Sequence, residues 1–419
     1  MKKLIACLLG AAVAVSAAAI TPKEEIKENP QKAGGVYYAY PGPAEKLTPA
    51  PKGFEPFYIS HYGRHGSRYL ISDRDYRAVI DVLEKADTAG ALTPAGSRLL
   101  RDLGPVWEEA RGRGGELTPL GRRQHHDIAS RMYDNYPQAF PDDARVTAAS
   151  TTVMRCAHSM FAFIEGLKEH NPALNIPRES SQRHMHYLNY HSPEAAPYTR
   201  RDSEASHEIR RFTEEMIKPG RIVGEIFSDS LFVRRNVDPA DFMTGLYWTA
   251  VDLQNMEADL DILNLFTIDE LTDLWQIYNF SFFAHNSSYA PAKGLHVANA
   301  KNLLRNIVET ADSYIASGDR GATLRFGHDG NIIPLTALMQ LPGCFTDETN
   351  PYRLGDTYAN FRVSPMASNL QLVFFRNAKG EVLVKALLNE RETALPAPTD
   401  IYPYYRWTDL RPALAEIAR

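Results

Sequence analysis

Three short apolar segments, each followed by a polar turn and then by a helical pattern, constrain the fold of this chain most strongly. The segments lie near residues 57 to 62, 144 to 149 and 322 to 327, and each has the composition of a buried strand. Two more strands are expected near 369 to 376 and 381 to 388. Strands that alternate with helices favour an α/β fold, here an α/β/α sandwich with a sheet between two helical layers.

A long helical insertion is expected to interrupt this α/β core. Between residues 160 and 317 the strand signals nearly vanish, and helical patterns replace them at 204 to 217, 241 to 256, 268 to 283 and 298 to 316. We therefore expect a discontinuous α/β domain formed by residues 20–159 and 318–419. Residues 160–317 would form an α-helical cap domain over its cleft.

The turn after the first segment reads Arg64-His65-Gly66-Ser67-Arg68. In open α/β sheets, ligands bind at the carboxyl ends of the strands. Arginine side chains match the oxygens of phosphate in pairs, and a neutral histidine can accept a phosphoryl group. Gly66 lets the backbone approach a neighbouring group closely. A solvated surface turn can have the same composition, so this turn does not establish phosphate chemistry by itself.

The other two turns carry complementary groups. The second leads from a β-branched stretch through hydroxyl residues into a helix, with Arg155 in its first turns. The third carries His328 and Asp329 in front of an apolar helical run. Arg155 and His328 are suited to binding phosphate, and Asp329 is suited to protonating a leaving alkoxide.

Taken together, these motifs resemble the histidine phosphatase superfamily and, within it, the acid-phosphatase and phytase branch. The resemblance covers about residues 55 to 395. It rests on Arg64-His65-Gly66-x-Arg68, on the segment from Ser150-Thr151 to Arg155, and on His328-Asp329. Further segments are similar to multiple inositol polyphosphate phosphatases: Pro334-Leu335, Pro365-Met366-Ala367-Ser368-Asn369-Leu370 and Leu387-Leu388-Asn389-Glu390. That subfamily usually has His-Ala-Glu where this chain has His328-Asp329-Gly330, which puts an inherited positional specificity in doubt.

The resemblance implies a phosphomonoester hydrolase that acts through a phosphohistidine. His65 would attack phosphorus, and Asp329 would protonate the leaving alcohol. The substrate phosphate would be bound by Arg64, Arg68, Arg155 and His328. Because Asp329 must be protonated and the charge of phosphate should raise its pKa, we expect an optimum on the acid side of neutral.

Several readings of the substrate and the activity remain open. Inositol polyphosphates such as phytate are the first expectation, and broad acid-phosphatase activity on sugar phosphates is the alternative. A phosphomutase would also form a phosphohistidine, but the secretory leader pattern at residues 1–19, described below, and the helical insertion argue against it. A non-catalytic phosphate-binding protein would gain nothing from the proton donor Asp329.

No cofactor or metal is required by this chemistry. The spacing of His184, His186 and His191 permits a zinc site, a loop that lines the cleft, or plain surface histidines. Arg183 and His184 are the candidates for contacts beyond the scissile phosphate. The pair His125-His126, on a helix that begins near Thr118, is expected to be structural.

The first residues indicate export. Lys2 and Lys3 precede an apolar stretch and Ala17-Ala18-Ala19, so residues 1–19 have the pattern of a secretory signal peptide, too short for a membrane anchor. We expect a periplasmic or secreted protein without stable membrane insertion. Cys7 lies in a sequence similar to a lipoprotein box, but it precedes most of the apolar stretch, so lipid attachment there is not expected.

Net charge and cysteines limit the partners. The chain carries a net charge of −5, and loss of Lys2 and Lys3 would leave −7, so no global positive field attracts nucleic acid. The expected partner is a small phosphate ester, and the oligomeric state cannot be read from the sequence. A disulfide between Cys156 and Cys344 is possible in an oxidising compartment but does not follow from their spacing.

Overall fold

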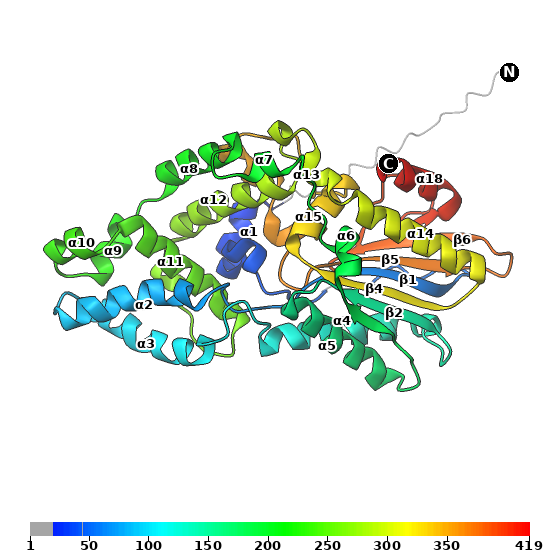
Figure 1. Ribbon diagram of the computed structural model, residues 1–419, viewed down its shortest axis with the longest axis horizontal. Helices are drawn as coiled ribbons and strands as arrows, with labels where there is room; N and C mark the ends of the chain where they lie inside the picture. The colour runs from blue at the N-terminus through cyan, green and yellow to red at the C-terminus, as the bar shows by residue number, and fades with distance from the viewer. Residues whose placement is uncertain (1–19, 44) are drawn as a thin grey trace, which may run out of the picture.

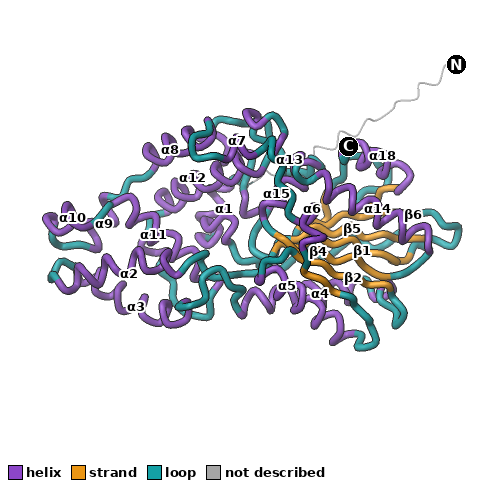
Figure 2. Tube along the Cα trace, in the orientation of Figure 1, coloured by secondary structure: helices purple, strands orange, loops and turns teal. Residues whose placement is uncertain are grey.

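The computed structural model describes residues 20–43 and 45–419. The predicted signal peptide and Cys7 lie outside the described residues. The molecule is elongated, with a helix-flanked sheet at one end and a lobe of helices at the other (Figures 1 and 2). None of the described helices is long and apolar enough to span a membrane.

The sheet has eight strands in the described chain, in the order β3-β2-β4-β1-β5-β6-β7, with β8 paired to β6. The strands are β1 (Glu55–Arg64), β2 (Arg145–Ser150), β3 (Arg178–Ser180), β4 (Gly321–Gly327), β5 (Asn369–Arg376), β6 (Val382–Leu388), β7 (Arg391–Thr393) and β8 (Tyr404–Arg406). The first four are parallel, whereas β5 and β6 run antiparallel to their neighbours. All five expected strands form, close to their expected positions.

Helices cover both faces of the sheet. On one face lie α4 (Pro119–Asn135) and α5 (Met154–His170), and on the other lie α14 (Lys301–Ser317) and α18 (Trp407–Ile417) (Figure 1). Neighbouring residues of β1 enter opposite layers: Tyr58 stacks on Tyr314 of α14 at 4.0 Å between ring centroids, and Ile59 joins the cluster that contains Phe163 of α5. Because both faces are covered, β1 reads as a continuous buried run rather than as an alternating one. The predicted α/β/α sandwich is confirmed.

The predicted helical insertion forms most of the lobe, but the lobe does not coincide with residues 160–317. Its helices from that range are α8 (Glu204–Met216), α9 (Gly220–Ile226), α10 (Ser230–Asn236), α11 (Pro239–Asp252) and α12 (Ile268–Asn286). They are joined by α1 (Pro22–Glu28), α2 (Asp73–Thr88) and α3 (Pro94–Ala110), which precede the range, whereas α14 packs on the sheet (Figure 1). A helical pattern shows which face is buried and not which partner buries it.

Short helices complete the described chain. They are α6 (Met185–Leu188), α7 (Ala196–Thr199), α13 (Leu295–Ala298), α15 (Asp329–Leu338), α16 (Pro351–Thr357) and α17 (Asn360–Val363), with the 3₁₀ turns η1 (Pro30–Tyr37), η2 (Pro137–Ala139), η3 (Gln182–His184), η4 (Leu253–Asn255), η5 (Leu263–Leu265) and η6 (Ala290–Ala292). Both cysteines of the described chain, Cys156 and Cys344, are free and buried, so the possible disulfide between them is absent.

Candidate active site

The three polar turns meet at one edge of the sheet. Because β1, β2 and β4 are adjacent and parallel, their carboxyl ends lie side by side, with Arg64 opposite Gly327 in the register. The amide of His65 donates to the carbonyl of Gly327 at 2.9 Å, and the amide of Thr151 donates to that of Phe326 at 3.0 Å. Segments that are far apart in the sequence are therefore joined by backbone hydrogen bonds.

Gly66 allows the loop after β1 to press against the start of α4. A Cβ atom on Gly66 would lie 2.4 Å from the carbonyl oxygen of Gly121, and one on Gly121 would lie 2.2 Å from that of Ser67. Real Cβ atoms do not come so close to backbone atoms, so both positions require glycine. The amide of Gly66 also donates to Oγ of Ser159 at 3.1 Å. This packing fixes the backbone next to His65.

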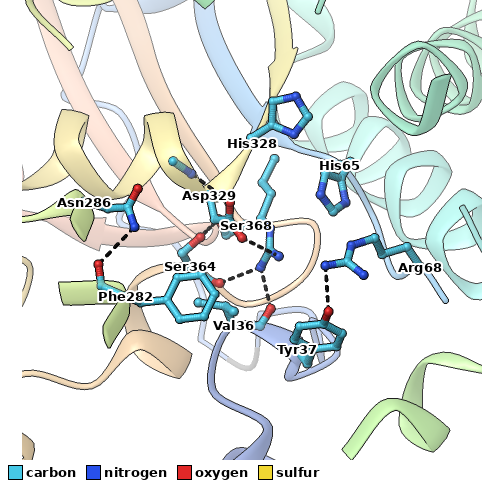
Figure 3. Close-up of polar contacts among 12 residues, drawn as sticks. Val36, Tyr37, His65, Arg68, Phe282, Asn286, His328, Asp329, Ser364 and Ser368 are labelled. Atoms are coloured by element: carbon cyan, nitrogen blue, oxygen red, sulfur yellow. Dashed lines mark hydrogen bonds and ion pairs between the residues drawn. The ribbon is translucent and has the colours of Figure 1, made fainter. Parts of the chain in front are cut away.

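Arg64 is fully buried at the end of β1. Its Nη1 donates to the carbonyl oxygens of Val36 and, at 2.8 Å, of Ser364. Its Nη2 lies 2.9 Å from Oδ2 of Asp329. The guanidinium is thus held by two chain segments distant in sequence and faces the carboxylate on a third. Figure 3 labels its partners Val36, Ser364 and Asp329.

Arg68 and Arg155 bring two more guanidiniums to the same place. Nη2 of Arg68 donates to the hydroxyl of Tyr37 at 2.8 Å, and its Cζ lies 4.6 Å from the centre of that ring. Nη1 of Arg155 lies 3.5 Å from the carbonyl oxygen of Gly115. Among the described residues, the buried Nε atoms of Arg64, Arg68 and Arg155 have no acceptor. Clustered cationic donors without acceptors form a site for an anion.

His65 lies within this cluster and is held uncharged. Its Nδ1 is 2.9 Å from the carbonyl oxygen of Gly66, which assigns the proton to Nδ1 and the lone pair to Nε2. Burial, followed by the charges of Arg64 and Arg155, holds the pKa of His65 well below its usual range. A free imidazole would be largely protonated at mildly acidic pH, whereas His65 keeps its lone pair there.

His328 and Asp329 stand at the start of α15, across from His65. The His328 ring centre is 5.7 Å from that of His65, and its Nε2 is 3.1 Å from Oγ1 of Thr151. Burial and the nearby arginines, against the opposing effect of Asp329, lower the pKa of His328 to about 4. The carboxylate of Asp329 accepts from the amide of Gly330 at 2.8 Å as well as contacting Arg64.

A proton donor needs a raised pKa, but in the absence of bound phosphate the pKa of Asp329 is lowered. Burial raises the pKa, but the charges of Arg64, His328 and Arg68 outweigh it, so the pKa lies below its ordinary value. The expected upward shift therefore has to come from the phosphate itself, whose negative charge would offset those same cations.

Arg183 and His184 lie in η3, after the edge strand β3. Both side chains contact Glu179, with Nε of Arg183 at 3.4 Å and Nε2 of His184 at 3.0 Å. No hydrogen bond within the described chain joins them to the cluster around His65.

The other histidines that the sequence singled out lie in structural positions. His186 bonds to the carbonyl of Arg183. No group of three or more His, Cys, Asp or Glu side chains in the described part of the chain is placed to hold a metal ion. His125 is buried against Phe326, with ring centres 5.6 Å apart.

Several residues that support the site carry no sequence signal of their own. Ser67 donates through Oγ to Oδ1 of Asn255 at 2.7 Å, and Nδ2 of Asn255 donates to the carbonyl of Tyr37 at 3.0 Å. Asp252 accepts from the amide of Leu70 at 3.2 Å. Asp252 and Asn255 lie in the helical lobe and Tyr37 lies in the N-terminal segment, and only the fold brings them to the loop after β1, which carries His65.

Comparison with known proteins agrees with this geometry. The model of the histidine phosphatase superfamily (branch 2) matches residues 63–389. Multiple inositol polyphosphate phosphatase 1 of Gallus gallus is 24% identical over 421 residues, covering 92% of this chain and 88% of the relative. The multiple inositol polyphosphate phosphatase of Bifidobacterium longum, solved in complex with inositol hexasulfate, superimposes with a TM-score of 0.73 at 20% identity, covering 92% of this chain and 97% of that one. The phytase of D. castellii gives a TM-score of 0.67 at 16% identity over 92% and 85% of the two chains. The chain is therefore an enzyme that belongs to the histidine phosphatase superfamily, branch 2.

Proposed function

We propose that this phosphatase hydrolyses phosphomonoesters, inositol polyphosphates first among them, through a phosphohistidine at Nε2 of His65. The observation that carries the proposal is the set of buried Nε donors on three arginines around an uncharged imidazole. Such donors would bind the oxygens of a phosphoryl group and hold its phosphorus against the lone pair.

The reaction would take two displacements. In the first, Nε2 of His65 bonds to phosphorus, the ester P–O bond breaks, and protonated Asp329 gives its proton to the leaving oxygen. In the second, the Asp329 carboxylate takes a proton from water while the water oxygen bonds to phosphorus and the P–N bond breaks. The enzyme returns to its starting state, and an alcohol and inorganic phosphate are released.

The electrostatics of the site support activity on the acid side of neutral. Bound phosphate would offset the charge of Arg64 and so raise the pKa of Asp329 from its low value in the free enzyme. His65 remains a nucleophile at acidic pH, because burial and the arginines keep its pKa low. Both required protonation states can then coexist in mild acid.

Relatives support the substrate class. The curated relative from Gallus gallus is named for inositol polyphosphates, and the Bifidobacterium longum enzyme has been solved with inositol hexasulfate and with phosphate. Broad activity on sugar phosphates is the second candidate, because Asp329-Gly330 replaces the Ala-Glu usual in inositol phosphatases. The leader pattern at residues 1–19 supports export, which N-terminal sequencing of the mature chain would test.

The proposal is tested by measuring phosphate release by the purified enzyme between about pH 3 and about pH 8. Suitable esters are inositol hexakisphosphate, glucose 6-phosphate and p-nitrophenyl phosphate. We expect an acidic optimum, and we expect His65→Ala to lose at least about 99% of the rate, whereas the exposed-site control His186→Ala keeps it. Radiolabelled substrate quenched in alkaline denaturant should label His65. Phosphate release by His65→Ala near the wild-type rate would refute the mechanism.

A further inference from the structure

The carboxyl group of Asp252, at the end of α11, is completely buried and takes no part in the proposed reaction. Three donors surround it. Oδ2 accepts from the hydroxyl of Tyr76 at 2.5 Å and from the amide of Leu70 at 3.2 Å, and Oδ1 accepts from Nδ2 of Asn255 at 3.3 Å. Leu70 belongs to the loop after β1, whereas Asp252 belongs to the helical lobe. Asp252 therefore reaches from the lobe to the segment that carries Arg68.

The peptide group between Tyr69 and Leu70 connects this carboxyl group to Arg68. Its N–H end donates to Asp252, and its C=O end accepts from Nη1 of Arg68 at 2.8 Å. An acceptor at the N–H end and a cationic donor at the C=O end polarise the peptide in the same direction, so each hydrogen bond strengthens the other. The two contacts also fix the plane of the peptide, because turning it would break both. The position of the Tyr69 carbonyl, and with it Nη1 of Arg68, thus depends on Asp252.

The guanidinium of Arg68 is held at both of its terminal nitrogens. Nη1 is held by the carbonyl of Tyr69, and Nη2 is held by the hydroxyl of Tyr37 (Figure 3). Nε is buried and has no acceptor among the described residues, so it is free for a bound phosphate. A long side chain loses conformational freedom when it binds a ligand, and holding it in place beforehand reduces that cost. Loss of either contact should therefore weaken phosphate binding.

We infer that Asp252 is a positioning residue, which orients Arg68 toward phosphate through the peptide between Tyr69 and Leu70. The inference rests on the proposed function, because that function assigns Arg68 to the substrate phosphate. The role requires an oxygen acceptor rather than a negative charge. Burial raises the pKa of Asp252 to about 7, so the group is largely uncharged in mild acid, where its oxygen still accepts from the amide of Leu70.

The test compares Asp252→Leu, which keeps the branched shape and loses the acceptor, with Asp252→Asn, which keeps an oxygen. Calorimetry measures the binding of inorganic phosphate to the purified proteins. We expect Asp252→Leu to weaken this binding about tenfold and Asp252→Asn to stay within about threefold of wild type. Asp241→Leu, the same change at an exposed position on α11, is the matched control and should leave the binding unchanged.

A double-mutant cycle separates positioning from a general loss of structure. Because Asp252 acts through Arg68, adding Asp252→Leu to Arg68→Ala should change phosphate affinity by less than about twofold. A further tenfold loss in that background, or an unchanged affinity in a folded Asp252→Leu protein, would overturn the inference. If urea unfolding shows that the leucine variant is not folded, Asp252→Ala replaces it in the cycle.

The hydroxyl of Tyr76 is the other acceptor near the Leu70 amide, at 3.0 Å. Tyr76→Phe should keep phosphate binding within about threefold of wild type, because Asp252 still accepts from that amide. A tenfold loss in Tyr76→Phe, with Asp252→Leu unaffected, would assign the contact to Tyr76 instead. Phosphate binding needs no turnover, so wild type that binds phosphate but releases none from any ester would refute the proposed function and not this role of Asp252.

Discussion

At the scale of single residues, the site sets the ionisation of its groups through their neighbours. The imidazole of His65 lies near Arg64 and Arg155, so protonation would add one more positive charge to a buried cationic cluster. Asp329, paired with Arg64, has its pKa moved down instead of up. The same cations therefore keep His65 uncharged and lower the pKa of Asp329, so in the proposed mechanism Asp329 depends on bound phosphate for its proton.

Asp329→Asn tests the donor. The amide cannot supply a proton, so kcat for glucose 6-phosphate should fall by about 10² to 10⁴, whereas p-nitrophenyl phosphate, whose leaving group needs no proton, should lose far less in the first displacement. Wild-type kcat should fall as pH rises through the pKa that Asp329 has in the enzyme–substrate complex. In the variant, this fall of kcat at higher pH should disappear. Equal losses for both esters in a burst-phase measurement would assign Asp329 another role.

At the scale of elements, the loop after β1 packs closely against α4 only because Gly66 and Gly121 have no side chain. Gly121→Ala would place its Cβ 2.2 Å from the carbonyl oxygen of Ser67 and force the loop to move. We expect a loss of stability of about 1 to 3 kcal/mol and a kcat at least about tenfold lower.

Gly104→Ala is the matched control for that variant. Gly104 is also a helical glycine, in α3, but apart from its chain neighbours and the backbone of its own helix no heavy atom of the described residues lies within 4 Å of the position of an added Cβ. This change should stabilise the protein by about 0.5 to 1 kcal/mol and leave kcat unchanged. Urea unfolding with parallel kinetics measures both variants. If Gly121→Ala behaved like Gly104→Ala, the close packing would not matter for the loop.

The sequence predicted the strands and helices that are long enough to show a run or a periodicity of apolar residues. A run such as Phe57–Tyr62 shows a buried strand directly, and Thr118 marks the start of α4 by capping it. The strands β3, β7 and β8 have three residues each, which is too short for any periodicity. The turns with Arg64, Arg155 and His328 could be placed at strand ends, whereas Tyr37 and Asn255 could not, because only tertiary packing brings them there.

At the scale of the whole molecule, the helical lobe and the α/β core are joined at the loop after β1, which carries His65. Asn255 in η4 contacts Ser67 on that loop and the backbone of Tyr37 in the N-terminal segment, all within the buried interior. The lobe is thus more than a cover over the cleft. It supplies part of the framework that fixes the loop carrying His65.

Asn255→Ala should disturb this connection. The substitution leaves the hydroxyl of Ser67 and the carbonyl of Tyr37 buried and without hydrogen-bond partners. The free energy of unfolding should therefore fall by about 1 to 3 kcal/mol. We also expect kcat to fall by a larger factor than KM rises. Asn236→Ala in α10 removes a single local hydrogen bond to Phe232 and serves as the control. Equilibrium unfolding and kinetics on p-nitrophenyl phosphate measure both. Unchanged kcat in Asn255→Ala would show that the lobe does not position the loop.

The two carbonyls that hold Arg64 belong to Val36 and Ser364, which lie far apart in the sequence on either side of Arg64. The ribosome must therefore synthesise the chain beyond Ser364 before both carbonyl acceptors of the Arg64 guanidinium are present. A chain that ended before Ser364 would leave Nη1 of Arg64 with one carbonyl acceptor instead of two. Assembly of the arginine cluster therefore waits until most of the chain has been synthesised.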